Sequence, residues 1–432
     1  MIWNPQMECL PHEQMTKLQL KRLQQTLTWV YERVPFYRQR MDDIGCQPGD
    51  VKSLEDLAKF PFTVKNDLRD NYPYGLFAVP LSDVVRLHAS SGTTGKPIVV
   101  GYNQYDLDAW SENIARIVTM AGVTRDDVAQ IAFGYGLFTG AFGLHYGLEK
   151  AGATVIPISG GNTERQLMIM KDFGTTTLIS TPTYALHMAE EALAMGINPR
   201  DDLKVRWGLF GGEACSEEYR KQIEELWGMV ATDNYGLSEV GGPGMSGECL
   251  MINGQHINED SFIVEILDPQ TFEPVEPGQL GEVVITTINR QTIPMIRYRT
   301  KDISSINYEP CACGRTTARL SKITGRTDDM LIIRGVNVFP SQIESVIMEV
   351  EGLAPHYQLI VTRKGYLDNV EVQVEISPDV FVDDYGRLEE IEDKLKQNLF
   401  RVLNIHLKTK LLEAGSIERT AGKAKRVIDL RK

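Results

Sequence analysis

Short strands that alternate with amphipathic helices occupy residues 128–233, and this alternation constrains the fold more than any other feature. It predicts an α/β fold, with a mostly parallel sheet that helices cover on both faces. Ligands of such sheets bind at the carboxyl ends of the strands. The expected strands are 128–133, 154–158, 177–181, 206–210 and 229–233, and the expected helices are 163–172, 183–195 and 216–227.

The pattern of expected secondary structure changes after residue 233. From about residue 246 strands predominate and Gly and Pro mark the turns, which predicts a β-subdomain at about 246–320. The last hundred residues combine a capping-box pattern at 341–344 with an alternating strand at 370–376 and an amphipathic helix at 388–402. A chain of 432 residues is too long for one ordinary core, so we expect this α+β segment to form a separate small domain.

The charge balance is acidic, with 58 acidic against 45 basic side chains and a net charge of −13. Basic surfaces bind the phosphates of DNA and RNA, so nucleic acid is not an expected partner. No apolar run approaches the ~20 residues that span a bilayer, so no membrane association is expected. The N-terminus has neither the basic nor the apolar segment of a secretory signal. We therefore expect a cytoplasmic protein.

A run of small polar residues before an expected strand at 98–100 is the sharpest local signal. Its glycines let the backbone approach a ligand closely, and its hydroxyls, N–H groups and lysine suit phosphate oxygens. The spacing differs from the P-loop, which has four residues between its glycines and Ser or Thr after the Lys. A flexible surface turn is the alternative, but we predict a phosphate-binding loop. Its residues are Ser90, Ser91, Gly92, Thr93, Thr94, Gly95 and Lys96.

Further motifs follow this loop along the chain. They are Tyr-Gly-Leu-Ser-Glu at 235–239, Tyr-Arg-Thr-Lys-Asp at 298–302, Gly-Arg-Thr-Asp-Asp at 325–329, and Gly-Lys at 422–423 with Arg426. In this order they resemble the motifs of the adenylate-forming superfamily, which includes acyl-CoA synthetases, peptide-synthetase adenylation domains and luciferases. Segments 133–140, 157–165 and 297–302 most resemble phenylacetate–CoA ligases. Lys301 stands where most of the superfamily has glycine.

The resemblance implies an AMP-forming acid–thiol ligase. The carboxylate of an arylacetic acid, phenylacetate or a close analogue, would attack the α-phosphate of ATP. The thiol of coenzyme A would then attack the acyl-AMP, giving a thioester and AMP. Positioning and charge stabilisation would carry the first step. The family resemblance also suggests a homodimer.

The same resemblance assigns residues to ATP. The loop 90–96 would hold the β- and γ-phosphates, and Glu239 would hold Mg²⁺, which prefers carboxylate oxygen. Asp302 would bind the ribose hydroxyls, with Arg326 beside it. Tyr235 would stack on the adenine, although ordinary core packing would give the same sequence. The other expected nucleotide-binding residues are Gly212, Glu213, Asp233, Asn234, Gly236 and Ser238.

A mobile C-terminal domain is also implied. Lys423 would reach the reacting oxygens in the first step, because lysine carries a compact charge on a long stem. Lys425 and Arg426 are rivals for this role. Asp328 would be the hinge between domains at 1–327 and 328–432, since one domain has to serve two reactions in turn. Arg334 and Gly335 would then face the pantetheine arm of CoA; a plain turn is the alternative.

The acid-binding pocket is expected in segment 133–142. Phe133, Tyr135 and Phe138 supply aromatic walls, and Gly136 and Gly140 leave room between them. Such a combination suits a flat ring. A core strand that turns into a helix is the alternative. Phenylacetate, hydroxyphenylacetate and indoleacetate are not distinguished by these residues.

Three thiols and one imidazole fall in the expected β-subdomain, at Cys249, His256, Cys311 and Cys313. Four such ligands are what a tetrahedral structural Zn²⁺ requires. Gly314 follows the pair Cys311 and Cys313, and a glycine in this place suits a tight turn. Inert thiols with a surface histidine are the alternative. The three other cysteines are scattered, and we expect them to be small core residues.

Two other functions remain open at this stage. An adenylating enzyme could use another aromatic acid, or pass the acyl group to a carrier thiol, an amine or a cofactor hydroxyl. A nucleotide-binding module without catalysis is the second. The presence of Glu239, Asp302 and Lys423 argues against it.

Overall fold

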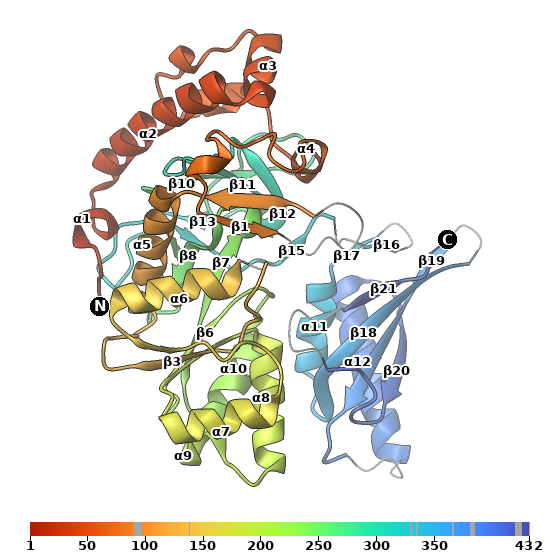
Figure 1. The fold of residues 1–432 in the computed structure, drawn as a ribbon. Helices are drawn as coiled ribbons and strands as arrows, with labels where there is room; N and C mark the ends of the chain where they lie inside the picture. The colour runs from red at the N-terminus through yellow and green to blue at the C-terminus, as the bar shows by residue number, and fades with distance from the viewer. Residues whose placement is uncertain are drawn as a thin grey trace.

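The computed structural model describes residues 1–89, 97–137, 139–328, 331–333, 336–364, 367–380, 385–419 and 426–431. Figure 1 shows a large part, here called the core unit (residues 1–328), beside a smaller one, the C-terminal unit (residues 331–431). In the described residues, no helix combines the length and apolarity needed to cross a bilayer.

A nine-stranded sheet forms the centre of the core unit, in the order β4-β3-β5-β6-β7-β8-β9-β14-β13. All pairs from β4 to β7 are parallel, and all pairs from β7 to β13 are antiparallel. The expected parallel sheet is therefore confirmed for its first part. The direction changes after β7 because only a short turn leads into β8, whereas parallel neighbours need a long crossover. The strands are β3 (Val128–Ile131), β4 (Thr154–Ile156), β5 (Thr177–Ser180), β6 (Trp207–Phe210), β7 (Val230–Leu237), β8 (Gly242–Glu248), β9 (Gln255–Ile257), β13 (Ile306–Asn307) and β14 (Arg319–Leu320).

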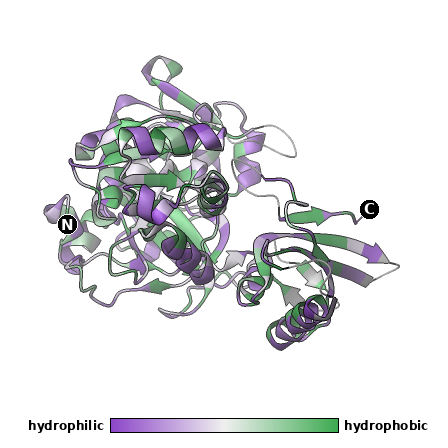
Figure 2. Cartoon of the chain, turned by 90° about the horizontal axis from the view of Figure 1, so that it is seen from below, coloured by the Kyte–Doolittle hydropathy of each residue, from purple (hydrophilic) through white to green (hydrophobic). Residues whose placement is uncertain are grey.

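Helices cover both faces of the parallel part, as the alternation predicts. Successive strand residues enter different cores: Leu178 belongs to the cluster that includes residues of α7, α8 and α10, and Ile179 belongs to the cluster that includes residues of α5 and α6. Leu209 and Phe210 divide in the same way. Figure 2 shows hydrophilic and hydrophobic residues mixed around the helices, as amphipathic helices require. The helices are α5 (Gln104–Met120), α6 (Gly140–Ala151), α7 (Thr163–Phe173), α8 (Pro182–Ala194), α9 (Pro199–Asp202) and α10 (Glu217–Trp227).

The strands of residues 246–320 are divided between two sheets. Some of them extend the nine-stranded sheet, and others form a four-stranded sheet in the order β10-β11-β12-β15. The chain changes sheet at Ser305, because β12 ends one residue earlier and β13 belongs to the nine-stranded sheet. The strands are β10 (Phe262–Leu267), β11 (Gly281–Thr287), β12 (Tyr298–Ser304) and β15 (Gly325–Arg326).

The N-terminal residues form helices and short turns that pack against the rest of the core unit. Helix α2 buries Leu23, Leu27 and Val30 and ends just before Pro35, which starts the next helix. A small antiparallel pair, β1 and β2, flanks the segment 90–96. The elements are α1 (Pro5–Glu8), α2 (His12–Arg33), α3 (Pro35–Asp43), α4 (Lys65–Asp70), β1 (Arg86–Ala89) and β2 (Val99–Tyr102), with 3₁₀ turns at Pro48–Asp50, Glu55–Lys59 and Leu81–Asp83.

The C-terminal unit has its own hydrophobic core between a four-stranded sheet (β20-β19-β18-β21) and two helices. Two expectations here are wrong in detail. The N-cap of α11 is Phe339, followed by Pro340 at the first helical position, so Ser341 lies inside the helix. Leu403 rather than Val402 completes the buried face of α12. The elements are α11 (Pro340–Met348), α12 (Tyr385–Leu403), β16 (Leu331–Ile333), β17 (Val336–Val338), β18 (Leu353–Lys364), β19 (Leu367–Ile376), β20 (Lys408–Leu412) and β21 (Val427–Asp429).

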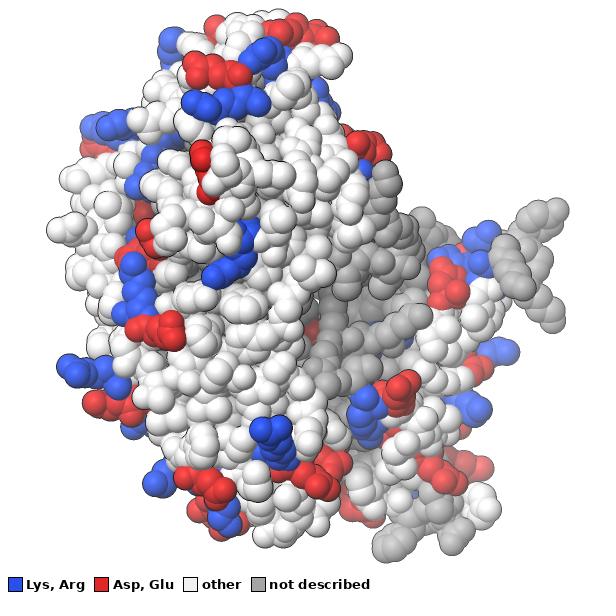
Figure 3. Space-filling model, viewed as in Figure 1, with Lys and Arg blue, Asp and Glu red and all other residues white. Residues whose placement is uncertain are grey.

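Charged side chains of both signs are interspersed over the face of the molecule seen in Figure 3. The described residues gather into no large single-sign region on that face.

Candidate active site

The carboxyl ends of β5 and β6 meet at one edge of the sheet, where the alternation predicts a ligand. Gly212 follows β6 with a φ of 82°, a backbone conformation that glycine adopts without strain. The next residue, Glu213, accepts a hydrogen bond of 2.6 Å from the hydroxyl of Thr183, which follows β5. The side chains after two parallel strands are thereby joined.

Asp233 and Asn234 are both engaged inside the core. The amide of Asn234 donates to the carbonyl of Phe210 at 2.6 Å and so fixes β7 against β6. Gln255 donates to Asp233 at 3.0 Å. Burial, together with the carboxylate of Glu248, raises the pKa of Asp233 to about 8. The described contacts of Asp233 and Asn234 are thus with other residues of the core. The sequence motif, which suggested nucleotide binding, did not predict these contacts.

Tyr235, Asp302 and Arg326 form one hydrogen-bonded group. The hydroxyl of Tyr235 lies 2.5 Å from Oδ2 of Asp302, and Nη1 of Arg326 lies 2.6 Å from Oδ1. Burial and the charge of Asp302 raise the pKa of Tyr235 well above its usual range, so its hydroxyl stays protonated and donates. The three residues come from β7, β12 and β15. Two motifs and the hinge segment therefore meet in space.

Glu239 lies in the short turn Ser238–Val240 after β7, and its side chain is buried. The hydroxyl of Tyr298 hydrogen-bonds to it, and Nζ of Lys65 lies 3.5 Å from its Oε1. Burial first, and then the charge of Glu239, raises the pKa of Tyr298 well above its usual range; Arg326 and Asp302 are also near enough to affect it. Glu239 and Asp302 therefore both lie near the hydroxyl of Tyr298. A carboxylate in this place can hold a divalent cation.

Two other residues of the 235–239 motif have structural reasons for their type. A Cβ on Gly236 would lie 2.2 Å from the carbonyl oxygen of Gly242, so β7 and β8 approach each other too closely for any other residue. The hydroxyl of Ser238 lies 2.9 Å from that of Thr139. This contact joins the motif to the segment in which the acid pocket is expected.

Lys301 has a φ of 70°, in the left-handed region that glycine favours. Its motif position is the one where most of the resembled superfamily has glycine, and this backbone conformation gives the physical reason. Lysine at such a position costs about 1 kcal/mol.

The segment expected to bind the acid is described except for Phe138. Phe133 is buried, and the ring of Tyr135 meets that of Phe142 edge-on with centroids 5.1 Å apart. The hydroxyl of Tyr135 lies 3.1 Å from Nδ1 of His145. Gly136 has a φ of 136°, and Gly140 begins α6. A strand does turn into a helix here, as the alternative reading has it, and aromatic rings line that turn.

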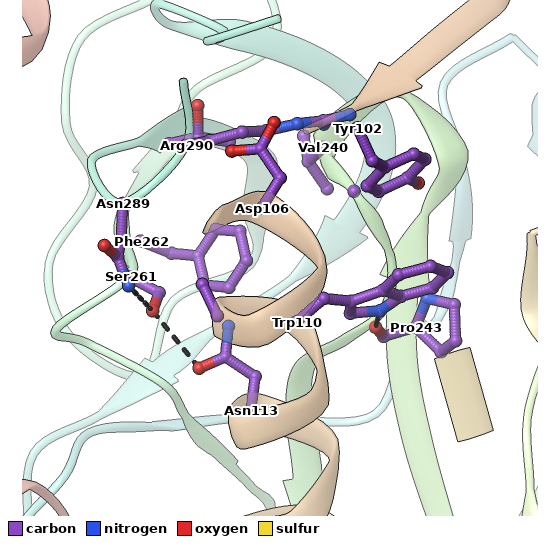
Figure 4. Close-up of a pocket in the computed structure, with 13 residues that line it drawn as sticks. Tyr102, Asp106, Trp110, Asn113, Val240, Pro243, Ser261, Phe262, Asn289 and Arg290 are labelled. Carbon is purple, nitrogen blue, oxygen red and sulfur yellow. Dashed lines mark hydrogen bonds between the residues drawn. The ribbon is translucent and has the colours of Figure 1, made fainter. Parts of the chain in front are cut away.

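Figure 4 shows a pocket that Val240, in the Ser238–Val240 turn, helps to line. Tyr102 and Trp110 stack there with centroids 4.9 Å apart, and Trp110 donates to the carbonyl of Pro243. The residues expected around the acid are not among its lining residues. The residues that line this pocket therefore pack beside the Ser238–Val240 turn and are not the residues expected to bind the acid.

Cys249, His256, Cys311 and Cys313 converge, with ligand atoms all within 4.8 Å of one another. Sγ of Cys249 lies 3.8 Å from Sγ of Cys311, and Sγ of Cys313 lies 3.3 Å from Nε2 of His256. A tetrahedral zinc with Zn–S bonds of ~2.3 Å would hold its sulfur ligands about 3.8 Å apart. The residues therefore fit the ion.

The surroundings of this cluster also suit a metal. Nδ1 of His256 lies 3.0 Å from the hydroxyl of Thr317, which leaves Nε2 facing the thiols. The N–H of Gly314 closes a tight turn on the carbonyl of Cys311. Among the remaining cysteines, Cys46 and Cys215 are buried as expected, but Cys9 is only partly buried and lies against Gly314.

Several predicted site residues lie outside the described residues: the loop Ser90–Lys96, Phe138, Arg334, Gly335 and Lys423. Their roles stay predictions. Asp328 is described, and its carboxylate accepts hydrogen bonds of 2.9 and 3.1 Å from Arg326. The chain leaves the four-stranded sheet at Arg326, which therefore contacts both Asp302 and Asp328.

Comparison with known proteins places these residues in a family. Residues 24–290 match the AMP-binding enzyme family, and residues 335–431 match the AMP-binding enzyme C-terminal domain. A phenylacetate–coenzyme A ligase of Thermus thermophilus is 45% identical over 446 residues, covering all of both chains. Those of Pseudomonas putida and Escherichia coli are 47% and 46% identical, over 98% and 97% of this chain and 96% and 95% of theirs.

The chain belongs to the phenylacetate–coenzyme A ligase family of AMP-binding enzymes. The resemblance seen in the motifs is thereby confirmed, as is the α/β fold with a large N-terminal part and a small C-terminal part. Members of the phenylacetate–coenzyme A ligase family are acid–thiol ligases that use ATP and coenzyme A.

Solved structures of 2-hydroxyisobutyryl-CoA ligase share this family's arrangement. The structure with 2-HIB-AMP in the postadenylation state has a TM-score of 0.93 at 30% identity, covering 98% of this chain and 91% of that one. The structure with 2-HIB-AMP and CoA in the thioesterification state has a TM-score of only 0.74, at 32% identity, with 99% and 92% coverage. The two units of the present chain are thus arranged as in the first state.

Sequence reasoning missed the residues around Glu239. Lys65 and Tyr298 contact its side chain, and Arg290 donates to its carbonyl at 3.1 Å. Tyr298 is the first residue of the 298–302 motif, so its position in the chain could have pointed to it. Lys65 and Arg290 lie in segments without local signals, so only the folded chain reveals them.

Proposed function

We propose that this chain joins phenylacetate, or a close arylacetic analogue, to coenzyme A with ATP, through an acyl-adenylate, and releases AMP and pyrophosphate. The main structural support for this proposal is the hydrogen-bonded group of Tyr235, Asp302 and Arg326 at the carboxyl end of the parallel sheet. It occurs in a chain that is 45–47% identical over nearly its full length to phenylacetate–coenzyme A ligases.

The residues divide the work of the first step among them. Asp302, held by Tyr235 and Arg326, accepts hydrogen bonds from the ribose hydroxyls. Glu239 would hold Mg²⁺, and the loop 90–96 would bind the β- and γ-phosphates. The acid lies along the aromatic turn at Phe133 and Tyr135.

Lys423 supplies positive charge to the reacting oxygens during the first step. Lys423→Ala should abolish acyl-AMP formation and spare thioester formation from supplied acyl-AMP. Equal loss of both steps would remove this role from Lys423.

We also assign a structural Zn²⁺ to Cys249, His256, Cys311 and Cys313. The spacing of the four ligand atoms and the hydrogen bond of His256 to Thr317 support this assignment. These residues join the end of β8 and strand β9 to the loop after β13. The ion would stabilise that loop and takes no part in the reaction.

The deciding experiment is a panel of carboxylic acids assayed for pyrophosphate and AMP, with and without coenzyme A. We expect CoA-dependent AMP release with phenylacetate. Pyrophosphate release with an acid but no CoA-dependent AMP would favour the second candidate, an adenylating enzyme with another acceptor. We expect the chain to be a cytoplasmic homodimer, and light scattering of the purified protein measures its oligomeric state.

A further inference from the structure

The C-terminal unit touches the core unit at the start of β18. The pairing of β18 with β19 is irregular between Leu353 and Tyr357, so Pro355 and His356 lie outside the regular ladder. The carbonyl of Pro355 accepts a hydrogen bond of 2.9 Å from the hydroxyl of Tyr219, which belongs to α10 of the core unit. The irregular segment therefore provides a docking contact between the units.

Arg426 completes this contact from the residue before β21. Its Nη2 donates to the hydroxyl of Tyr219 at 2.7 Å, and its guanidinium lies 4.3 Å from the ring centre of Tyr357. Burial raises the pKa of Tyr219 well above its usual range. Its hydroxyl therefore accepts from Arg426 and donates to Pro355 at the same time. An arginine of one unit is thus bound to a buried hydroxyl of the other.

The backbone of Arg426 is fixed as well. Its carbonyl accepts a hydrogen bond of 2.8 Å from the N–H of Leu359 in β18. Within the C-terminal unit, Glu344 lies 3.9 Å from Nε of Arg426 and also accepts from the hydroxyl of Tyr357 at 2.6 Å. Arg426 is thus fixed within its own unit. Its contact with Tyr219 therefore also fixes the residues next to it in the sequence relative to the core unit.

A second contact lies beside the first. Nε2 of His356 lies 3.1 Å from Oε1 of Glu190 in α8 of the core unit. Burial acts to raise the pKa of Glu190, but hydrogen bonds from His187 and His356 lower it to about 2. The carboxylate of Glu190 therefore stays charged. Pro355 and His356, which are adjacent in β18, thus contact two different helices of the core unit, α10 and α8.

We propose that Arg426 is a positioning residue, which holds the C-terminal unit on Tyr219 for acyl-adenylate formation and releases it for the CoA step. This proposal rests on the proposed function. Lys423 is three residues from Arg426 in the sequence, a span of at most about 10 Å of chain. A docked Arg426 therefore restricts the distance between Lys423 and the core unit.

The comparison of states supports the release. The arrangement with this contact matches the postadenylation structure with a TM-score of 0.93, against 0.74 for the thioesterification structure. Arg426 and Tyr219 lie on opposite sides of the interface, so a rotation of one unit relative to the other separates them. The contact then favours one half-reaction and opposes the other.

The test compares the two half-reactions in Tyr219→Phe and Arg426→Gln. Tyr219→Phe keeps the buried ring and removes only the hydroxyl. We expect pyrophosphate release in a single turnover with phenylacetate and ATP to slow by about 10- to 100-fold in both variants, as expected for loss of a charge-assisted hydrogen bond. Thioester formation from supplied phenylacetyl-AMP and CoA should proceed at the wild-type rate or faster.

Arg431→Gln is the matched control. Arg431 is likewise a bound arginine of the C-terminal unit, but its partners are the carboxylates of Asp368 and Asp429, which both lie in its own unit. It should leave both half-reactions unchanged. Thermal unfolding shows whether each variant is folded.

Equal slowing of both half-reactions, or no slowing in Tyr219→Phe, would overturn the positioning role. A wild-type protein that releases no pyrophosphate with any acid would instead refute the proposed function. The two failures are therefore distinguishable.

Discussion

The hydroxyl of Tyr235 donates to Oδ2 of Asp302 over 2.5 Å, and the contact joins the end of β7 to strand β12. The other carboxylate oxygen of Asp302 accepts from Arg326, which also holds Asp328. Asp302 is thus oriented from two sides by the protein itself. Such preorganisation is what a positioning carboxylate needs.

Tyr235→Phe removes the hydrogen bond to Asp302 and leaves the ring in place. A hydrogen bond to a charged group contributes about 1.5–3 kcal/mol, so we expect the KM for ATP to rise about tenfold or more. Steady-state AMP release at varied ATP measures it. Tyr385→Phe, at a tyrosine that is 75% exposed, is the control. An unchanged KM would show that Asp302 is oriented without Tyr235.

Glu239→Gln keeps the shape of the side chain and removes its charge. Mg²⁺ prefers carboxylate oxygen, so we expect acyl-AMP formation to fall about 100-fold and to require more Mg²⁺ for half-maximal rate. Pyrophosphate release titrated with Mg²⁺ measures both effects. If the variant kept the wild-type Mg²⁺ requirement, the metal would be held by other groups.

Removal of zinc should destabilise the loop that carries Cys311 and Cys313. We expect one zinc per chain by elemental analysis, and a lower thermal midpoint after treatment with a chelator. Cys313→Ser should lose the metal, whereas Cys46→Ser, at a buried cysteine outside the cluster, should retain it. A metal-free protein whose midpoint ignores the chelator would rule the site out.

Asp233 should make stability depend on pH. Its pKa is raised to about 8 by burial and by Glu248, compared with about 3.9 in an unfolded chain. Between these values the folded chain keeps a proton that the unfolded chain has lost. The stability from this group is therefore complete below about pH 4 and declines as pH rises to about 8, by at most about 1.4 kcal/mol per pH unit.

Asp233→Asn is neutral at every pH and should remove this decline. Denaturant unfolding at pH 5.5 and 7.5 measures the free energy of unfolding of both proteins. The advantage of the variant should be larger at pH 7.5. The same difference at both values would mean that Asp233 does not hold the proton.

Asp328→Pro should separate the two steps, because proline fixes φ where we place the rotation. We expect acyl-AMP formation to persist and thioester formation to fail. Asp328→Ala removes the same contact with Arg326 while leaving the backbone free, and it should retain the second step. Full-rate thioester formation in the proline variant would place the hinge elsewhere.

The strand–helix alternation, the buried faces of the helices and the motifs could all be predicted from the amino-acid sequence. These are local properties: Leu178 and Ile179 enter opposite cores because neighbouring strand residues point to opposite faces. The four zinc-ligand candidates were also found from residue type. Their spacing along the chain left inert thiols as an open alternative.

Tertiary structure alone decided which distant residues meet. Asn234 and Asp233 face the core because β7 is covered on both sides, which their motif does not reveal. Lys65 reaches Glu239, and Arg426 reaches Tyr219, across long stretches of chain. Such contacts depend on how sheets and helices pack, and packing is set by the whole chain rather than by any local pattern.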